Sequence, residues 1–257
     1  MAGKLDSLME RMGGQRALRR WSRAAEKAGA QDLSALREQR THARLVRRQL
    51  NKVLHIADER LTLPAVGSKA IQMPMGSDWG YRPDVWRGAL FPAGHAPVPS
   101  KAKLSDEATV HHDCNVCEIA VRQVRNTRAE DLAPFGLQLD VFRFEGTFLS
   151  LAIDLPKEAS EGLQRRHIVR LEAIVELEHS LEIFARLNVK HGPNTEQIVR
   201  EMPLGDVKAV VEFDLAYSEV NEKRVESMWL DLILKGPQMN QITLRDVSLS
   251  RRPRAEL

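Results

Sequence analysis

The chain has 257 residues, of which 43% are hydrophobic and 28% charged, a composition typical of a soluble globular protein. No run of 18 apolar residues occurs, which excludes a membrane-spanning helix, and the first residues lack the apolar segment of a secretory signal, so we expect a cytoplasmic protein. The net charge is +3, but residues 1–60 carry 14 Lys and Arg against 7 Asp and Glu, a local charge of +7 that leaves −4 for the rest.

Residues 1–61 are predicted to form a basic, amphipathic helical extension. A long helix is expected over 33–61, with Asp32 or Ser34 capping its start. A shorter helix over 15–27 should precede it, with Gly29 as the break between them. The apolar positions of the long helix recur at heptad spacing and predict one apolar face: Leu36, Ala43, Val46, Leu50, Val53 and Ala57, widened by Leu54 and Leu61.

Residues 62–105 are dense in proline and glycine, which leaves room for few regular elements. Yet the segment contains Trp79, Tyr81, Trp86 and Phe91, and a free linker would not hold half of the chain's four tryptophans. We therefore expect an ordered wrapper that packs on the domain that follows.

Residues 106–257 alternate apolar and polar side chains in segment after segment, which predicts half-buried strands. The fold class expected is mainly β: an antiparallel, jelly-roll-like β-sandwich with an N-terminal α-helical extension. In the last strand the phase of the alternation slips at Arg245 and Asp246, which predicts a β-bulge. Strands are predicted at residues 108–113, 117–125, 137–145, 147–155, 165–178, 180–190, 196–201, 207–217, 228–235 and 241–251.

A cluster of His and Cys precedes and begins the second predicted strand. His112, Cys114 and Cys117 are weak candidates for zinc ligands, because zinc favours thiolate and imidazole. A structural zinc site usually needs four ligands, no second Cys pair exists, and the adjacent His111 and His112 would point to opposite faces of a strand. We therefore favour a strand end with a partly buried thiol, and expect neither a metal nor a redox pair.

Signs of catalysis are sparse. The chain contains no Gly-x-Ser-x-Gly elbow and no glycine-rich phosphate loop. Glu172 and Glu176 share one strand face, as a pair of glycosidase carboxylates would have to, but a solvated charged face is the simpler interpretation. The protein is thus expected to be non-enzymatic and to need no cofactor, with a hydrolase as the remaining alternative.

Five arginines of the long helix form a basic surface: Arg37, Arg40, Arg44, Arg47 and Arg48. The simplest interpretation is a solvated helix face. Alternatives are docking on an anionic membrane surface, at the periphery of the inner membrane, or on a partner protein; nucleic acid is the weaker alternative. A cytoplasmic scaffold or interaction protein that docks in this way is the second functional hypothesis.

The side of the sandwich opposite its core supplies the first functional hypothesis. Alternation places aromatic and polar side chains there together, and an aromatic platform flanked by planar polar groups suits a sugar ring. The rival interpretation is that the helix over 33–61 covers this face, its leucines lying on Trp229, Phe184 and Ile233. The ligand-binding candidates are Phe184, Arg186, Asn188 and Lys190 on one strand and Trp229 and Asp231 on another.

Two resemblances add to these patterns. Residues 241–250, Gln-Ile-Thr-Leu-Arg-Asp-Val-Ser-Leu-Ser, resemble the closing strand of jelly-roll carbohydrate-binding modules, and residues 229–234 and the region of Phe213 resemble the strands before it. This resemblance implies the fold and, more loosely, a glycan ligand. The whole chain also resembles an uncharacterised alphaproteobacterial family of unknown function, through residues 126–136, 188–197 and 249–257, and this family implies no activity. Together these observations predict a non-catalytic recognition module whose partner is a glycan or a protein, with the oligomeric state left open.

Overall fold

The computed structural model describes residues 2–66, 71, 73–128, 131–205 and 208–254. The chain divides into two compact units, residues 1–52 and residues 53–257. The helices are α1 (Ala2–Lys27), η1 (Ala28–Ala30), α2 (Leu33–Val66), α3 (Asp84–Arg87), α4 (Lys157–Ser160), η2 (Leu215–Tyr217) and η3 (Glu222–Arg224). The strands are β1 (Trp79–Tyr81), β2 (Gly94–His95), β3 (Lys101–Lys103), β4 (Ala108–His112), β5 (Cys117–Arg125), β6 (Phe135–Phe144), β7 (Leu149–Asp154), β8 (His167–Leu177), β9 (Glu182–His191), β10 (Asn194–Glu201), β11 (Ala209–Asp214), β12 (Val225–Lys235) and β13 (Asn240–Pro253).

The first unit consists of α1, the short turn η1 and most of α2. Asp32 caps α2, because its Oδ1 accepts hydrogen bonds from the backbone N–H groups of Ser34 and Ala35, both at 3.0 Å. The break predicted at Gly29 lies in η1, whereas α1 begins well before residue 15 and α2 continues past residue 61 to Val66. Among the described residues, no helix combines the length and the apolar character that crossing a bilayer requires.

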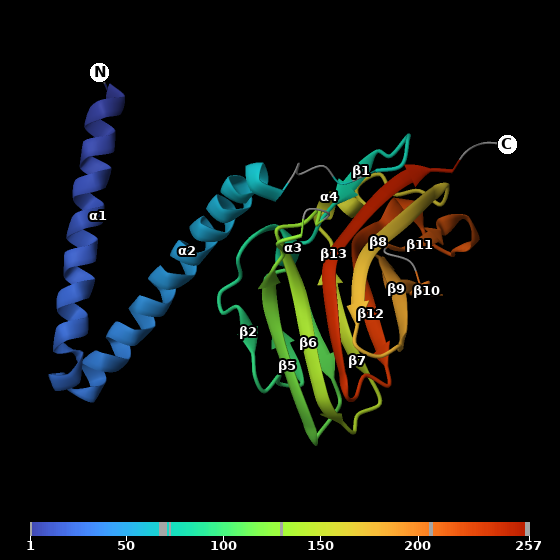
Figure 1. Ribbon diagram of the computed structural model, residues 1–257. Helices are drawn as coiled ribbons and strands as arrows, with labels where there is room; N and C mark the ends of the chain where they lie inside the picture. Colours follow the sequence, from blue (N-terminus) through green and yellow to red (C-terminus); the bar gives the residue numbers. More distant parts are fainter. Residues whose placement is uncertain (1, 67–70, 72, 129–130, 206–207, 255–257) are drawn as a thin grey trace. The chain divides into compact units, whose positions relative to one another are not determined.

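The second unit is an antiparallel β-sandwich, which confirms the predicted fold class. One sheet has the strand order β11-β8-β13-β6-β5-β2, with β1 pairing the end of β13, and the other has the order β10-β9-β12-β7-β4-β3. Figure 1 shows these sheets as two layers, with β8, β13, β6 and β5 in one and β9, β12 and β7 in the other. The predicted strands between residues 108 and 251 all occur, with ends that differ by a few residues.

The core lies between the two sheets and is built by the alternation that the sequence shows. On β9 and β12, Ile183, Ala185 and Leu187 and their neighbours Leu230 and Leu232 are at most 1% exposed. Burial of each such leucine or isoleucine contributes roughly 1.5–3 kcal/mol, and the residues between them must then point away from the core. The sheet that carries β9 and β12 therefore presents their polar and aromatic residues on its outer face.

The wrapper over residues 73–105 is ordered and more regular than expected, since it contributes α3 and the short strands β1, β2 and β3. Trp86 on α3 is fully buried, and its indole Nε1 donates a hydrogen bond of 2.9 Å to the carbonyl of Leu244. β2 lies so close to β5 that a Cβ on Gly94 would stand 2.3 Å from the carbonyl oxygen of Val121, which explains the glycine.

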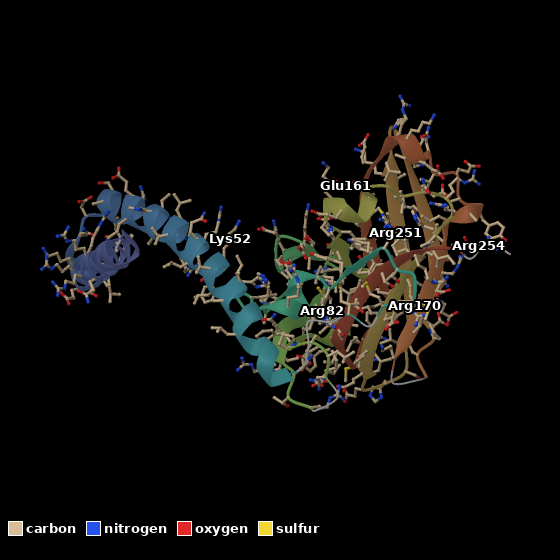
Figure 2. The ribbon with its side chains drawn as sticks, turned by 90° about the horizontal axis from the view of Figure 1, so that it is seen from above. Lys52, Arg82, Glu161, Arg170, Arg251 and Arg254 are labelled. Atoms are coloured by element: carbon tan, nitrogen blue, oxygen red, sulfur yellow. The ribbon has the colours of Figure 1, made fainter. Side chains whose placement is uncertain are left out.

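Two buried arginines, labelled in Figure 2, fasten the wrapper to β13. Arg82 donates two hydrogen bonds, of 2.8 and 2.9 Å, to the carboxylate of Asp246. Arg251 donates to Asp78 at 3.0 Å and to the carbonyls of Ala159 and Glu161, both at 2.9 Å. Each guanidinium is thus held by a carboxylate, as a buried charge requires.

Candidate functional site

Six residues of β9 and β12 form what we call the outer polar face of the six-stranded sheet. They are Phe184, Arg186, Asn188 and Lys190 on β9 and Trp229 and Asp231 on β12. Their neighbours along each strand point into the core, and the register sets Trp229 opposite Asn188 and Asp231 opposite Arg186. All six ligand-binding candidates therefore lie on one face, although their role as a binding site stays a prediction.

A hydrogen-bonded group occupies the centre of this face. Arg186 donates to Asp231 Oδ2 from Nε at 3.0 Å and from Nη2 at 2.8 Å, and Asn188 Nδ2 donates to the same oxygen at 2.8 Å. Asn188 is fully buried and Asp231 is 5% exposed, although both side chains point away from the core. The carboxylate is thus locked by three charge-assisted or amide donors, so its orientation is fixed before any ligand arrives.

One acceptor in this group has no partner. The Asn188 Nδ2 also faces the carbonyl oxygens of Arg186 and Trp229, at 3.2 and 3.4 Å, which fixes the orientation of the amide. Its Oδ1 is buried and lies without a hydrogen-bond donor among the described residues. A buried amide oxygen without a donor costs about 1–3 kcal/mol of stability.

Aromatic and charged side chains border the centre. Trp229 and Phe184 are half-buried, and the Lys235 ammonium lies 5.9 Å from the Phe184 ring centroid. At opposite ends of the two strands, Lys190 pairs with Glu226 and Lys235 with Glu182, each at 2.8 Å. The face thus combines two aromatic rings with planar polar groups and carries paired charges at its borders. The interpretation that the leucines of the helix over 33–61 lie on this face is wrong for Leu54 and Leu61, which are 57% and 76% exposed.

The His and Cys cluster does not assemble a metal site among the residues that the structure describes. The His112 Nε2 lies 3.2 Å from the carbonyl oxygen of Val98, and His112 is buried while His111 is half-buried. The Cys114 thiol donates to the carbonyl of Val116 at 3.0 Å. Burial, together with the neighbouring Cys114, raises the pKa of the Cys117 thiol to about 11.

The two carboxylates considered for catalysis, Glu172 and Glu176, are held by cations. Glu172 accepts from Lys208 at 2.7 Å and from Arg170 at 2.8 Å; burial alone would raise its pKa, but these hydrogen bonds outweigh burial and hold the pKa below its ordinary value. Glu176 pairs with Arg128 and with Arg245. Glu172 therefore lacks the raised pKa of a general acid, and Glu176 is held between two arginines.

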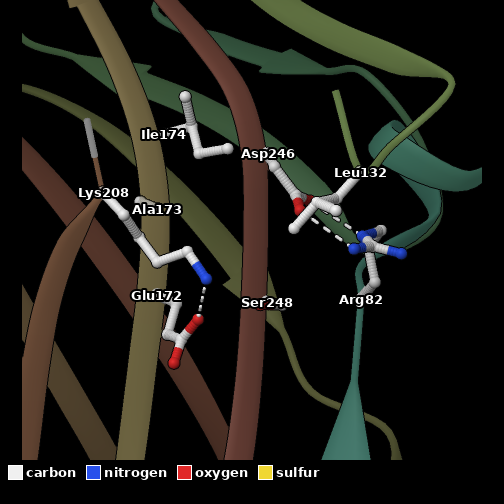
Figure 3. A pocket seen from close by; sticks show the side chains of 8 residues that line it. All are labelled: Arg82, Leu132, Glu172, Ala173, Ile174, Lys208, Asp246 and Ser248. Carbon is white, nitrogen blue, oxygen red and sulfur yellow. Dashed lines mark hydrogen bonds and ion pairs between the residues drawn. The ribbon is translucent and has the colours of Figure 1, made fainter. Parts of the chain in front are cut away.

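Two cavities among the described residues of the sandwich are less suited to a ligand. Figure 3 shows one between Arg82, Asp246, Glu172 and Lys208, whose volume of about 10 Å³ leaves room for one water at most. A wider groove of about 310 Å³ lies near the ends of β8 and β11, and Ser180 is the one polar side chain in its lining of Val175, Leu177, Ser180, Leu204, Gly205 and Ala209. Such a lining supplies little to orient a ligand.

Sequence reasoning missed a polar cluster in the wrapper. The Tyr81 hydroxyl donates to Glu107, whose other oxygen accepts the backbone N–H of Asp84 at 2.8 Å. Asp84 accepts from the Ser105 hydroxyl at 2.7 Å, and burial, followed by the charge of Glu107, raises the pKa of Asp84 to about 6. This cluster joins the wrapper to the loop before β4, and no motif or spacing in the sequence signals it.

The arginines of the predicted basic surface lie on α2. All five, Arg37, Arg40, Arg44, Arg47 and Arg48, are exposed. They occupy successive turns of one helix, so they present their guanidinium groups as a single positively charged band.

A model described as "Family of unknown function (DUF6478)" matches residues 1–257. No curated protein matches the sequence. Among solved structures, the chain is similar to the enzymatically active domain of tailspike protein 4 of bacteriophage CBA120, with a TM-score of 0.39 and 7% sequence identity. The match covers 56% of this chain and 19% of the tailspike chain, so this chain spans about a fifth of that protein's length. It is similar to a family 11 carbohydrate-binding module of Clostridium thermocellum in complex with a β-1,3-1,4-mixed-linked tetrasaccharide, with a TM-score of 0.39 and 10% identity over 64% of this chain and 99% of the module. It is also similar to the CBM22-1 xylan-binding domain of Paenibacillus barcinonensis Xyn10C, with a TM-score of 0.38 and 11% identity over 63% of this chain and 98% of that domain.

Proposed function

The chain belongs to the DUF6478 family of unknown function. We propose that its β-sandwich is a non-catalytic recognition module that binds a carbohydrate on the outer polar face. Membership confirms the expected resemblance to a family without a known activity, while the alphaproteobacterial origin stays a prediction. The proposal has to be argued from the residues of the face, because the family brings no activity with it.

The observation that carries the proposal is the place of Trp229. This half-buried indole lies directly across the strands from Asn188 and next along its own face to Asp231, which Arg186 holds in place. A pyranose has flat apolar faces and an equatorial rim of hydroxyls, so it can stack on an indole while its rim reaches planar donors and acceptors. The face offers both kinds of contact within neighbouring positions of two strands.

The state of the carboxylates supports binding over catalysis. Glycoside hydrolysis needs one carboxyl group with a raised pKa and a second one facing it across a cleft. On the outer polar face Asp231 is ion-paired with Arg186, and on the other sheet Glu172 and Glu176 are ion-paired with cations. Residues arranged in this way can position a sugar but are poorly suited to protonate a glycosidic oxygen.

A glycan array with the full chain, followed by titration of the retained sugars against tryptophan fluorescence, tests the proposal. Replacement of Trp229 by Ala should weaken binding of a retained glycan by about tenfold, since the stacking contact is worth on the order of 1 kcal/mol beyond the area it buries. Asn188→Leu should weaken it as well, because the Asp231 carboxylate then loses the amide donor that helps to fix its orientation.

The matched control is Phe142→Ala. Phe142 is 59% exposed on β6, in the other sheet, so its loss removes an aromatic ring of the same sandwich without touching the outer polar face. We expect this variant to bind like the wild type. The proposal would fail if the array retained no glycan, or if Trp229→Ala and Phe142→Ala weakened binding equally.

A further inference from the structure

Helix α2 carries an apolar stripe along residues 36–61. At 3.6 residues per turn its members fall within about 100° of the helix circumference. Four of them are more than half exposed: Leu50 at 56%, Val53 at 63%, Leu54 at 57% and Leu61 at 76%. The stripe as a whole comprises Leu36, Ala43, Val46, Leu50, Val53, Leu54, Ala57 and Leu61. A helix with this many exposed apolar residues in one line is expected to bury them against another body.

The contact between α2 and the wrapper uses a different side of the helix. His55, which belongs to the second unit as the wrapper does, lies with its Nδ1 3.2 Å from the carbonyl oxygen of Ala89. His55 lies about 150° around the helix from the middle of the apolar stripe. Val53, Leu54 and Leu61, in the same unit, remain exposed beside this contact. The docking of these turns on the wrapper therefore leaves the stripe residues of the second unit uncovered.

The charges beside the stripe point to an anionic partner. Residues 33–57 contain six Lys and Arg but a single acidic residue, Glu38. Arg40 and Arg47 flank the stripe directly on one side, and Arg37, Arg44 and Arg48 lie next to them around the helix. Arginines in these positions can reach up to phosphates while the apolar residues below them enter the acyl region.

The same charges argue against a second copy of the chain as the occupant. In a helical pair the positions that flank the apolar stripe face each other and normally carry opposite charges. Here one flank holds Arg40 and Arg47 and the other holds His42 and Gln49. Over residues 33–57, a second copy would bring arginine or neutral residues to face arginine, and neither flank of that segment carries a carboxylate.

We propose that α2 binds along its length to the surface of an anionic lipid bilayer, with the apolar stripe in the acyl boundary and the arginines among the headgroup phosphates. The exposed leucines favour a bilayer over nucleic acid, which would use the arginines but leave the apolar stripe in water. The proposal concerns the helix and does not depend on whether the sandwich binds a glycan.

Sedimentation of the full chain with vesicles tests it. One set of vesicles consists of phosphatidylcholine alone and a second of phosphatidylcholine mixed with phosphatidylglycerol. We expect binding to the second set, weakened by added salt, and much weaker binding to the first. The triple variant Arg37→Gln, Arg40→Gln, Arg44→Gln should bind roughly a hundredfold more weakly, at somewhat less than tenfold per charge, whereas the corresponding lysine variant should keep most of the affinity.

Leu45 provides a matched control for the apolar stripe. It is exposed to the same extent as Leu50, 56% in both cases, but lies on the other side of the helix. The double variant Leu50→Gln, Leu54→Gln should have a roughly hundredfold lower affinity for anionic vesicles, because two leucine side chains no longer transfer from water into the acyl region. Leu45→Gln should bind like the wild type. Far-ultraviolet circular dichroism of each variant verifies that the helix is retained.

Three outcomes would overturn the proposal. The first is the absence of binding to anionic vesicles by a folded wild-type chain. The second is equal weakening by Leu45→Gln and by the double variant Leu50→Gln, Leu54→Gln, which would show that the side of the helix does not matter. The third is a chain that does not bind vesicles but instead does one of two things. It self-associates through Leu50 and Leu54, or it binds a DNA duplex tightly whether or not both leucines are replaced.

Discussion

The ion pair between Arg82 and Asp246 allows a sharp prediction about stability. Both side chains are 6% exposed, and their two hydrogen bonds are 2.8 and 2.9 Å long. Replacement of Arg82 by Met keeps a side chain of similar length but leaves the carboxylate of Asp246 buried without its cation. Removal of one partner of a buried pair costs about 3–5 kcal/mol in free energy of unfolding, which is a large part of the stability of an ordinary domain.

Urea denaturation followed by tryptophan fluorescence measures this cost, since Trp86 lies in the same wrapper and reports its loss. The double variant Arg82→Met, Asp246→Leu should recover most of the lost stability, because no charge is then left buried. An exposed ion pair serves as the control: Lys103 and Asp106 are 3.1 Å apart with side chains 63% and 74% exposed, so Lys103→Met should cost less than about 1 kcal/mol. A cost below 1 kcal/mol for Arg82→Met, or a double variant no more stable than the single one, would refute the reasoning.

Three further predictions concern titration and packing. The folded-state pKa of Asp84 is about 6, above its ordinary value of 3.8, so the folded chain binds this proton more tightly than the unfolded chain. The free energy of unfolding should therefore fall by on the order of 2–3 kcal/mol as the pH rises between these two values, and then level off. In the variant Asp84→Asn the urea midpoint should change little across this pH range. Glu107→Gln should reduce the same pH dependence, since the charge of Glu107 contributes to the raised pKa, and an unchanged profile in both variants would count against this account. Trp86→Ala should lower the free energy of unfolding by about 3–5 kcal/mol, as the indole is fully buried and its bond to the Leu244 carbonyl is lost; calorimetry that finds only a small shift in Tm would contradict the packing described. With a pKa of about 11, Cys117 should react with iodoacetamide near pH 8 roughly a hundredfold more slowly in the folded chain than in urea. Mass spectrometry of the labelled peptide measures both rates, and equal rates would contradict the raised pKa.

The long strands were predictable because each contains its own signal. In β9 and β12 the apolar residues alternate over ten or more positions, and one sheet face buries them, so the period is visible without knowledge of the neighbours. The same alternation assigned Arg186, Asn188 and Asp231 to the outer side of the sheet. What it could not predict is their mutual register, since the strands are joined by a long excursion through β10 and β11 and only pairing sets Asp231 opposite Arg186.

The wrapper was harder to predict for a physical reason. β1, β2 and β3 have two or three residues each, too few for a period, and they exist because β13, β5 and β4 offer free edges or ends to pair with. The buried pair of Arg82 and Asp246 likewise joins residues 164 positions apart. The proline and glycine content of the segment indicates correctly that long elements are absent, but the tertiary contacts that order it have no local sequence signal.

The bulge in β13 connects a pattern visible in the sequence of one strand with a tertiary contact of the wrapper. Without an extra residue, strict alternation after Leu244 would turn Asp246 inward and Val247 outward. The register shift between Leu244 and Asp246 reverses this, so that Val247 is fully buried in the core and Asp246 points to the outer side, where Arg82 meets it. The phase slip visible in the sequence is therefore more than an irregularity of one strand. It turns a carboxylate to the side where the wrapper can bind it, and deletion of Arg245 should consequently release the wrapper as well as disturb β13.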